Sequence, residues 1–104
     1  MVRIAFKMKL LAGNEAEYKK RHDEIWPELV SLLTETGIVD YSIFHDSTTN
    51  DLFGVLKIAS PELMKNLPAQ PVMQKWWTYM GDIMESNADN SPVSVPLAEV
   101  FYLA

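Results

Sequence analysis

The chain has 104 residues, of which fourteen are acidic, nine are basic and none is cysteine. Its length favours a single domain over residues 1–104, and its formal charge of -5 disfavours nucleic acid and anionic membranes as partners. The lack of cysteine excludes disulfides, zinc–thiolate sites and thiol nucleophiles. The sequence has no apolar stretch typical of a signal peptide or a membrane span, so we expect a cytoplasmic protein.

The first predicted element is a strand over residues 2–10, where apolar side chains stand at every second position. A period of two is typical of a strand with one buried face. Gly13 interrupts this pattern, and Asn14 with Glu17 three positions later resembles a capping box. We therefore expect a helix from Asn14 to about Thr36.

One face of this predicted helix is apolar, with residues spaced by four and three: Tyr18, His22, Ile25, Leu29 and Leu32. This spacing indicates a face that packs against the rest of the protein. Pro27 should distort the helix, because proline lacks an N–H group and clashes with the carbonyl four residues before it. A kink is therefore expected one turn after His22.

Two further strands are predicted at residues 38–45 and 52–59, on either side of a turn-rich segment. We expect them to pair as an antiparallel hairpin. Ser60 and Pro61 are suited to begin a short helix, and Pro71 to begin a second main helix. The apolar face of this second helix would comprise Met73, Trp76, Trp77, Met80, Ile83 and Met84.

The last predicted strand lies near residues 97–103, which gives the order strand, helix, strand, strand, helix, strand. This order predicts an α+β fold of the ferredoxin-like type, βαββαβ, in which an antiparallel sheet carries both helices on one face. Residues 100–103 are apolar on both sides of the predicted strand. The second sheet face is therefore expected to pack on another subunit in a homodimer, or else to be covered by loops.

His22 is the first candidate for acid–base chemistry, because imidazole has an ordinary pKa of about 6.5 and exists in both protonation states near neutrality. A histidine on an apolar helix face is nevertheless more often a satisfied core residue. Tyr18, one turn earlier, favours the functional interpretation, because a sealed core would use apolar side chains at both positions. The pair indicates the wall of a pocket.

Three further aromatic residues are candidates for ligand binding. Trp76 and Trp77 point about 100° apart on a helix, so one indole can pack in the core while the other contacts a ligand. Indole rings suit a ligand with one apolar face and a polar edge, such as a sugar. Tyr41 shares its strand face with Val39 and Ile43, and should therefore point toward the helices. Its hydroxyl then needs a hydrogen-bond partner, which a backbone group would provide as well as a ligand, and the sequence alone does not choose between them.

A metal site is not predicted, because His45 is the only other histidine and neither histidine has a second ligand at a metal-binding spacing. Asp82, Glu85 and Asp89 are candidate bases near the end of the second helix. Acidic residues on helices usually remain solvated, so these three carboxylates carry little weight.

Four segments resemble those of L-rhamnose mutarotases, in the same order and spacing: Arg21–Glu28, Trp76–Met80, Asn90–Ser94 and Glu99–Leu103. No single segment is decisive, but together they extend the resemblance over essentially the whole chain. The chain departs from the family at Ala88, where the family's loop often has proline.

The resemblance implies interconversion of the α and β anomers of L-rhamnose in the cytoplasm, on a dimeric α+β barrel that needs neither a metal nor an organic cofactor. By position, it implies that His22 is the proton donor. It also implies that the substrate contacts Tyr18, Tyr41, Trp76 and Trp77. L-rhamnose would then be the small-molecule partner of the protein.

Mutarotation requires one proton delivered to the ring oxygen and one removed from the anomeric hydroxyl. We expect His22 to protonate the ring oxygen, while Tyr18, a carboxylate or a bound water handles the anomeric proton. Two other functions remain compatible with the residues alone. One is a small monooxygenase acting on haem or an aromatic substrate. The other is a non-enzymatic ligand-binding dimer in which His22 and Tyr18 are merely packed.

Overall fold

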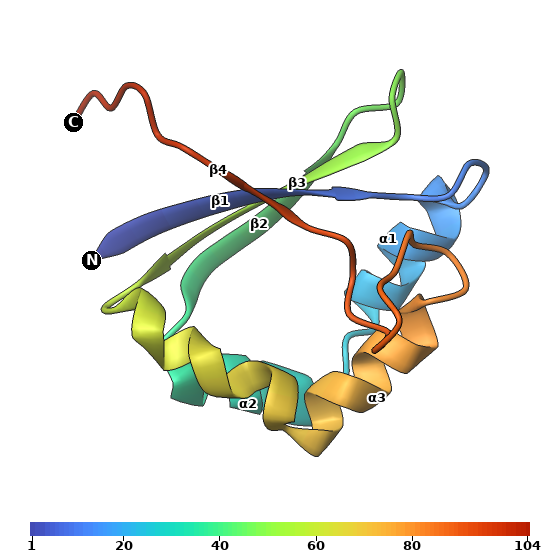
Figure 1. Ribbon diagram of the computed structural model, residues 1–104, viewed down its shortest axis with the longest axis horizontal. Coiled ribbons are helices and arrows are strands. Elements are labelled where there is room, and N and C mark those ends of the chain that lie inside the picture. The colour runs from blue at the N-terminus through green and yellow to red at the C-terminus, as the bar shows by residue number, and fades with distance from the viewer.

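A four-stranded antiparallel sheet forms one layer of the computed structural model, which describes residues 1–104. The strands lie in the order β2 (Val39–His45), β3 (Asp51–Ile58), β1 (Val2–Lys9) and β4 (Val95–Leu97). The helices α1 (Glu15–Asp23), α2 (Pro27–Thr36), η1 (Pro61–Ala69, a 3-10 helix) and α3 (Pro71–Met80) lie on one side of this sheet (Figure 1). None of these helices is long and apolar enough to cross a membrane.

The predicted hairpin of β2 and β3 and the predicted first strand are confirmed. On β3, the buried face consists of Leu52, Gly54, Leu56 and Ile58. Each of these residues pairs with a residue of β1 from the alternating apolar set, as in the pairs Phe6 with Gly54 and Met8 with Leu52. Because paired residues of antiparallel strands point to the same face, β1 and β3 present their apolar side chains to the helices together.

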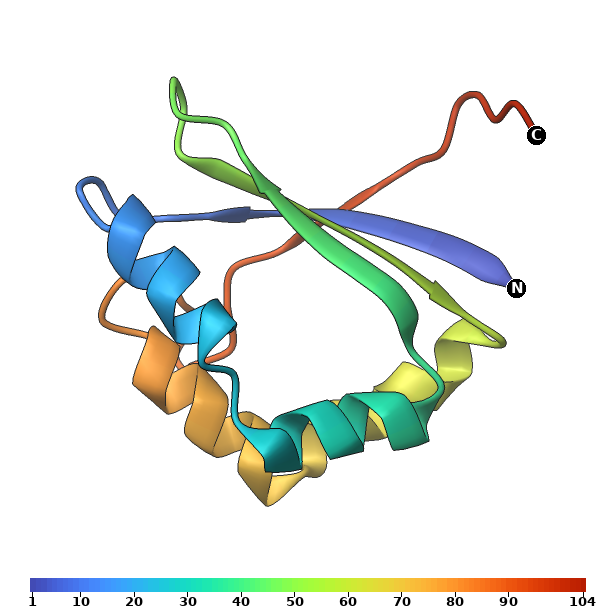
Figure 2. The ribbon, with the colours of Figure 1, turned by 180° about the vertical axis from the view of Figure 1, so that it is seen from behind.

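The single kinked helix predicted from Asn14 to Thr36 is wrong, since the chain forms two helices that run in different directions (Figure 2). Residues 24–26 separate them, and Trp26 has an extended backbone with φ -64° and ψ 133°. The ring of Pro27 causes this break, because a proline disfavours helical geometry in the residue before it. Pro27 itself occupies the first turn of α2, where its missing N–H group costs nothing.

The predicted capping box at Asn14 is also wrong. The Asn14 amide donates hydrogen bonds to the carbonyls of Leu11 and Ala12, at 3.0 and 3.2 Å, and makes no cap bond to the helix. Glu17 is engaged with Arg21 instead. The asparagine side chain therefore stabilises the turn before α1, where Gly13 has a φ of 84°, and only the Asn14 carbonyl joins the helix.

The last strand is shorter than the one predicted at residues 97–103. β4 ends at Leu97, and the following residues lead away from the sheet (Figure 1). The prediction fails because this stretch has no partner strand within the subunit, and Phe101 is left 77% exposed. Side-chain contacts hold the tail to β1 instead, through Arg3, which lies 3.9 Å from Glu99 and 4.8 Å from the ring centroid of Tyr102.

The second main helix is also shorter than its apolar face suggested, since α3 ends at Met80. Ile83 and Met84 lie beyond it and are nevertheless buried in the same core as Met73, Trp76 and Met80. Met84 pairs with Leu10 in an isolated bridge at the end of β1. The apolar pattern therefore predicted burial at these positions correctly, but not their secondary structure.

Leu56 on β3 is fully buried and provides a test of the core. Replacement by alanine leaves a cavity, so we expect Leu56→Ala to lower the free energy of unfolding by about 2–5 kcal/mol. Leu63 on η1 is 49% exposed, and Leu63→Ala should change this free energy by no more than about 0.5 kcal/mol. Chemical denaturation of both variants measures the difference, and equal effects would contradict this description of the core.

Candidate active site

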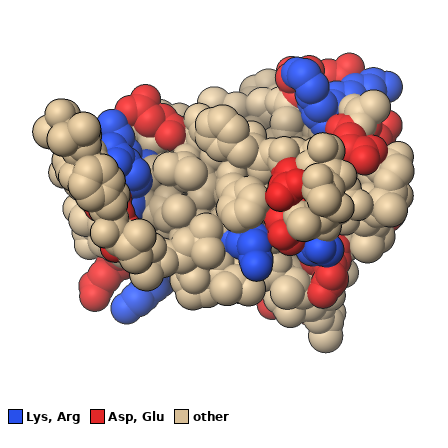
Figure 3. Space-filling view, turned by 90° about the horizontal axis from the view of Figure 1, so that it is seen from above, with Lys and Arg blue, Asp and Glu red and all other residues tan.

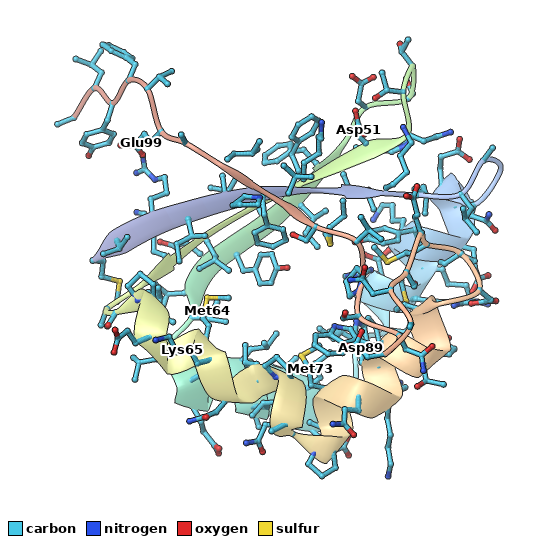
Figure 4. All side chains as sticks on the ribbon, in the orientation of Figure 1. Asp51, Met64, Lys65, Met73, Asp89 and Glu99 are labelled. Carbon is cyan, nitrogen blue, oxygen red and sulfur yellow. The ribbon has the colours of Figure 1, made fainter.

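A cavity of about 1050 Å³ lies between the helices and the sheet. Figure 4 shows Met64 of η1 and Met73 of α3 on its helix side. Hydrophobic residues make up most of its wall, and the polar groups are few. An apolar cavity with a small number of polar groups is the usual form of a small-molecule site.

The five residues singled out from the sequence come together in this cavity. They also line a smaller recess of about 80 Å³: Tyr18, His22, Tyr41, Trp76 and Trp77. Three residues of the loop after α3 also line the recess: Ser86, Asn90 and Pro92. Asn90 and Pro92 fall within the segment Asn90–Ser94, which the family resemblance includes, but none of the three residues was predicted to belong to the site. Asn90 has a φ of 71°.

His22 lies near the end of α1, and a backbone hydrogen bond determines which of its ring nitrogens is available. Its Nδ1 atom lies 3.0 Å from the carbonyl oxygen of Tyr18. Since a carbonyl oxygen only accepts, Nδ1 must carry the hydrogen and donate it. The neutral imidazole then has its lone pair on Nε2, which is the nitrogen left to exchange a proton with a ligand.

Aromatic rings surround the His22 imidazole on two sides. The Tyr18 ring stacks on it with a centroid distance of 4.3 Å, and the Trp76 ring meets it edge-on at 5.4 Å. These rings keep water from the imidazole, and this desolvation lowers the pKa of His22. The hydrogen bond to the Tyr18 carbonyl and the charge of Asp23 oppose the shift but do not reverse it. This lowered pKa favours the neutral imidazole at pH 7.

Trp76 packs in the core and also lines the cavity. Core packing and a place in the cavity wall, which the sequence left as alternatives, are therefore compatible for this residue. Its side chain is only 6% exposed and belongs to the main core. The rings of Trp26 and Tyr79 pack against its indole at centroid distances of 5.1 and 5.7 Å. Trp77 is half-buried and has more of its surface free for a ligand.

Arg21 connects α1 with the end of α3. Its guanidinium donates to Asp82 at 2.8 and 3.2 Å, to Glu17 at 2.7 Å and to the Tyr79 carbonyl at 2.7 Å. It also lies 4.4 Å from the centroid of the Tyr79 ring. Bidentate contacts of this kind have a fixed geometry, so the ion pair orients the helix that carries His22.

The acidic residues considered as bases lie outside this cavity. Asp82 accepts hydrogen bonds from Arg21, which lower the pKa of its carboxyl group. Asp89 accepts hydrogen bonds from the backbone and hydroxyl of Ser91, which also lower its pKa. Neither Asp82, Glu85 nor Asp89 lines the cavity or the recess.

Tyr41 reaches the recess from the sheet. One extra residue on β2 between Val39 and Ser42 shifts the register, and Asp40 in this bulge has a φ of 51°. The Tyr41 side chain remains 38% accessible because it borders the open cavity. Its apolar surroundings nevertheless desolvate the hydroxyl and raise the pKa of Tyr41 to about 12.

No three histidine, aspartate or glutamate side chains come together in an arrangement suited to a metal ion. His45 lies at the end of β2, where its Nε2 atom is 3.2 Å from the Asn50 side-chain oxygen in the hairpin turn.

The neutral state of His22 can be tested by an NMR titration of its imidazole. We expect a midpoint below about 6.5, the ordinary value for histidine, because the surrounding rings disfavour the charged form. The variant Trp76→Leu opens one side of the ring and should move the midpoint upward. A midpoint at or above 6.5 in the unaltered protein would contradict the desolvation argument.

The chain is similar to L-rhamnose mutarotases in both sequence and structure. A family model described as L-rhamnose mutarotase matches residues 3–103. An L-rhamnose mutarotase of Agrobacterium fabrum is 63% identical over 95% of this chain and 92% of its own. One from Brucella anthropi is 60% identical over 97% and 95%. The crystal structure of L-rhamnose mutarotase from Formosa agariphila matches with a TM-score of 0.93 and 49% identity, over all of both chains.

Proposed function

This chain belongs to the L-rhamnose mutarotase family, a family of carbohydrate isomerases, and we propose that it interconverts the α and β anomers of L-rhamnose by acid–base catalysis at His22. The observation that carries the proposal is the convergence of His22, Tyr18, Tyr41, Trp76 and Trp77 on one recess. We further propose that the chain acts as one mutarotase domain in the cytoplasm. The monooxygenase and the non-enzymatic dimer considered above have no counterpart among the relatives described.

The reaction is the opening and reclosing of the sugar ring. His22 exchanges a proton with the sugar through Nε2, since Nδ1 is occupied by the Tyr18 carbonyl. The indole rings of Trp76 and Trp77 supply an apolar wall for the sugar ring, and the tyrosine hydroxyls bind its polar edge. The few polar groups of an otherwise apolar cavity therefore meet where a small sugar would lie.

Removal of the imidazole tests the role of His22. Positioned acid–base catalysis contributes about 10²–10⁴-fold, or about 3–5 kcal/mol of barrier lowering, so we expect His22→Gln to slow anomer exchange by that factor. Saturation-transfer NMR on L-rhamnose measures the exchange directly. The matched control is His45→Gln, which removes the other histidine, at the end of β2; this residue borders the wide cavity but lies outside the recess, so the variant should retain the rate.

If a folded His22→Gln protein retained the full rate, His22 would be excluded from catalysis. If the unaltered protein showed no exchange above the uncatalysed rate, the function itself would be excluded. Circular dichroism on each variant separates loss of chemistry from loss of fold.

We also propose that the fold is of the ferredoxin-like βαββαβ type, and that two copies join into a dimeric α+β barrel. The strand order β2-β3-β1-β4 supports the first part. The outer face of the sheet supports the second, because much of this face is uncharged (Figure 3) and carries exposed apolar residues such as Val95 and Leu97. Isolated monomers rarely expose large apolar patches.

The dimer can be tested by placing a charge on this outer face. Leu97 pairs with Ala5 of β1, and we expect Leu97→Arg to shift the protein from dimer to monomer, because a buried unpaired charge is costly. Leu63→Arg places the same charge on an exposed apolar position of η1 and should leave the dimer intact. Sedimentation velocity measures both, and a monomeric unaltered protein would contradict the proposal.

A further inference from the structure

The proposed reaction needs two proton transfers, and His22 can perform only one of them at a time. Its Nδ1 hydrogen is bonded to the Tyr18 carbonyl, so only Nε2 can accept or release a proton toward the sugar. Ring opening removes a proton from the anomeric hydroxyl and delivers one to the ring oxygen. A second group must therefore face the sugar together with His22.

The carboxylates near the cavity do not provide this group. No aspartate or glutamate lines the recess that contains His22. Three carboxylates line the wider cavity. Glu15 is exposed in the first turn of α1, Asp23 is bound to Lys19 at 2.9 Å, and Asp40 lies 3.5 Å from Lys57. The ionisable groups that share the recess with His22 are the hydroxyls of Tyr18 and Tyr41.

The two tyrosines occupy different walls. Tyr18 lies on the same helix as His22, its ring is stacked on the imidazole, and its side chain is only 8% exposed. Tyr41 comes from β2 and has far more of its surface open to the cavity. A sugar in the recess therefore lies between His22 on the helix side and Tyr41 on the sheet side.

We propose that Tyr41 is the second catalytic residue and donates its hydroxyl proton to the ring oxygen while His22 Nε2 accepts the proton of the anomeric hydroxyl. The bond between C1 and the ring oxygen breaks, and the electron pair of the anomeric O–H bond forms the C1 carbonyl. The products of this step are the open aldehyde, an imidazolium and a tyrosinate. The inference rests on the proposed mutarotase function.

Ring closure reverses these transfers after the aldehyde has rotated about the C1–C2 bond. The imidazolium returns its proton to the carbonyl oxygen, and the tyrosinate recovers its proton from the hydroxyl that becomes the ring oxygen. In this scheme His22 donates a proton only in the closing half of the reaction, to the carbonyl oxygen, and not to the ring oxygen as expected from the sequence. The raised pKa of Tyr41 opposes the loss of its proton, and the imidazolium formed in the same step offsets this cost because it balances the charge of the transient tyrosinate.

The sheet holds the Tyr41 ring in position through Phe6 and Gly54. Phe6 pairs with Gly54 across β1 and β3. A Cβ atom at Gly54 would lie 2.6 Å from Cε2 of Phe6, so only glycine lets the phenyl ring lie against the sheet here. The Phe6 ring in turn packs against Tyr41 with a centroid distance of 6.2 Å. Phe6 and Gly54 are therefore positioning residues for Tyr41.

The decisive experiment compares Tyr41→Phe with the unaltered enzyme by anomer exchange over a range of L-rhamnose concentrations. We expect kcat to fall by about 10²-fold or more with a KM change of only a few-fold, because the phenyl ring is retained and the proton is lost. Tyr79→Phe removes a hydroxyl outside the recess and serves as the matched control. Tyr18→Phe should raise KM more than it lowers kcat.

A Tyr41→Phe enzyme with unchanged kcat, or a large kcat loss confined to Tyr18→Phe, would overturn the proposal. Absence of exchange in the unaltered enzyme would instead overturn the mutarotase function.

The role of Gly54 and Phe6 in positioning Tyr41 is tested by the substitution Gly54→Ala. This substitution should lower kcat when Tyr41 is present, but not when it is added to the Tyr41→Phe variant. Adding Phe6→Leu to the Gly54→Ala variant should partly restore its kcat. If Gly54→Ala lowered kcat by the same factor with Tyr41 and with Phe at position 41, the role of Gly54 would be merely structural.

Discussion

The ring of Pro27, which holds Trp26 in an extended conformation, decides the shape of the cavity. A continuous helix over the 22 residues from Glu15 to Thr36 would be about 33 Å long, close to the 36 Å of the longest axis of the molecule. Such a rod could lie along only one side of the cavity. The break lets α1 stand at one end, where it carries His22, while α2 takes a different direction below the sheet (Figure 2).

This arrangement concentrates rigid contacts around the imidazole. The Arg21–Asp82 pair joins α1 to the end of α3, and the rings of Tyr18 and Trp76 cover His22. Desolvation and a hydrogen bond to backbone act on the same ring, so its charge state and its tautomer are both determined before a ligand arrives. Groups that are held in place beforehand need little reorganisation during a reaction.

The sheet has two faces with different tasks. Its inner face supplies Tyr41, whose position depends on the close contact between Phe6 and Gly54 and on the bulge at Asp40. A non-glycine residue with a positive φ is held only where surrounding contacts maintain it. The outer face has no helix over it, and its apolar residues are stabilised only if a second molecule covers them.

Local patterns in the sequence were sufficient for the positions of the first three strands, the hairpin and most buried residues, because alternation and helical spacing follow from backbone geometry alone. They also singled out Tyr18, His22, Tyr41, Trp76 and Trp77, which the fold brings together. The patterns failed at Asn14, at Pro27 and in the tail after Leu97. At Asn14 a competing contact decides the outcome, and in the tail the lack of a partner strand does. At Pro27 the steric effect on Trp26 ends the helix outright, where a kink was predicted.

Only the tertiary structure decided which atoms face one another. The sequence by itself could not show that Nδ1 of His22 bonds to the Tyr18 carbonyl, that Asp82 is engaged by Arg21, or that Tyr41 and His22 line the same recess. The first of these contacts lies within α1. The other two join residues from separate parts of the chain, and such distances have no local signature in the sequence. The sequence therefore determined the chemical groups of the site, and the packing of helices on the sheet determined how those groups are placed to act.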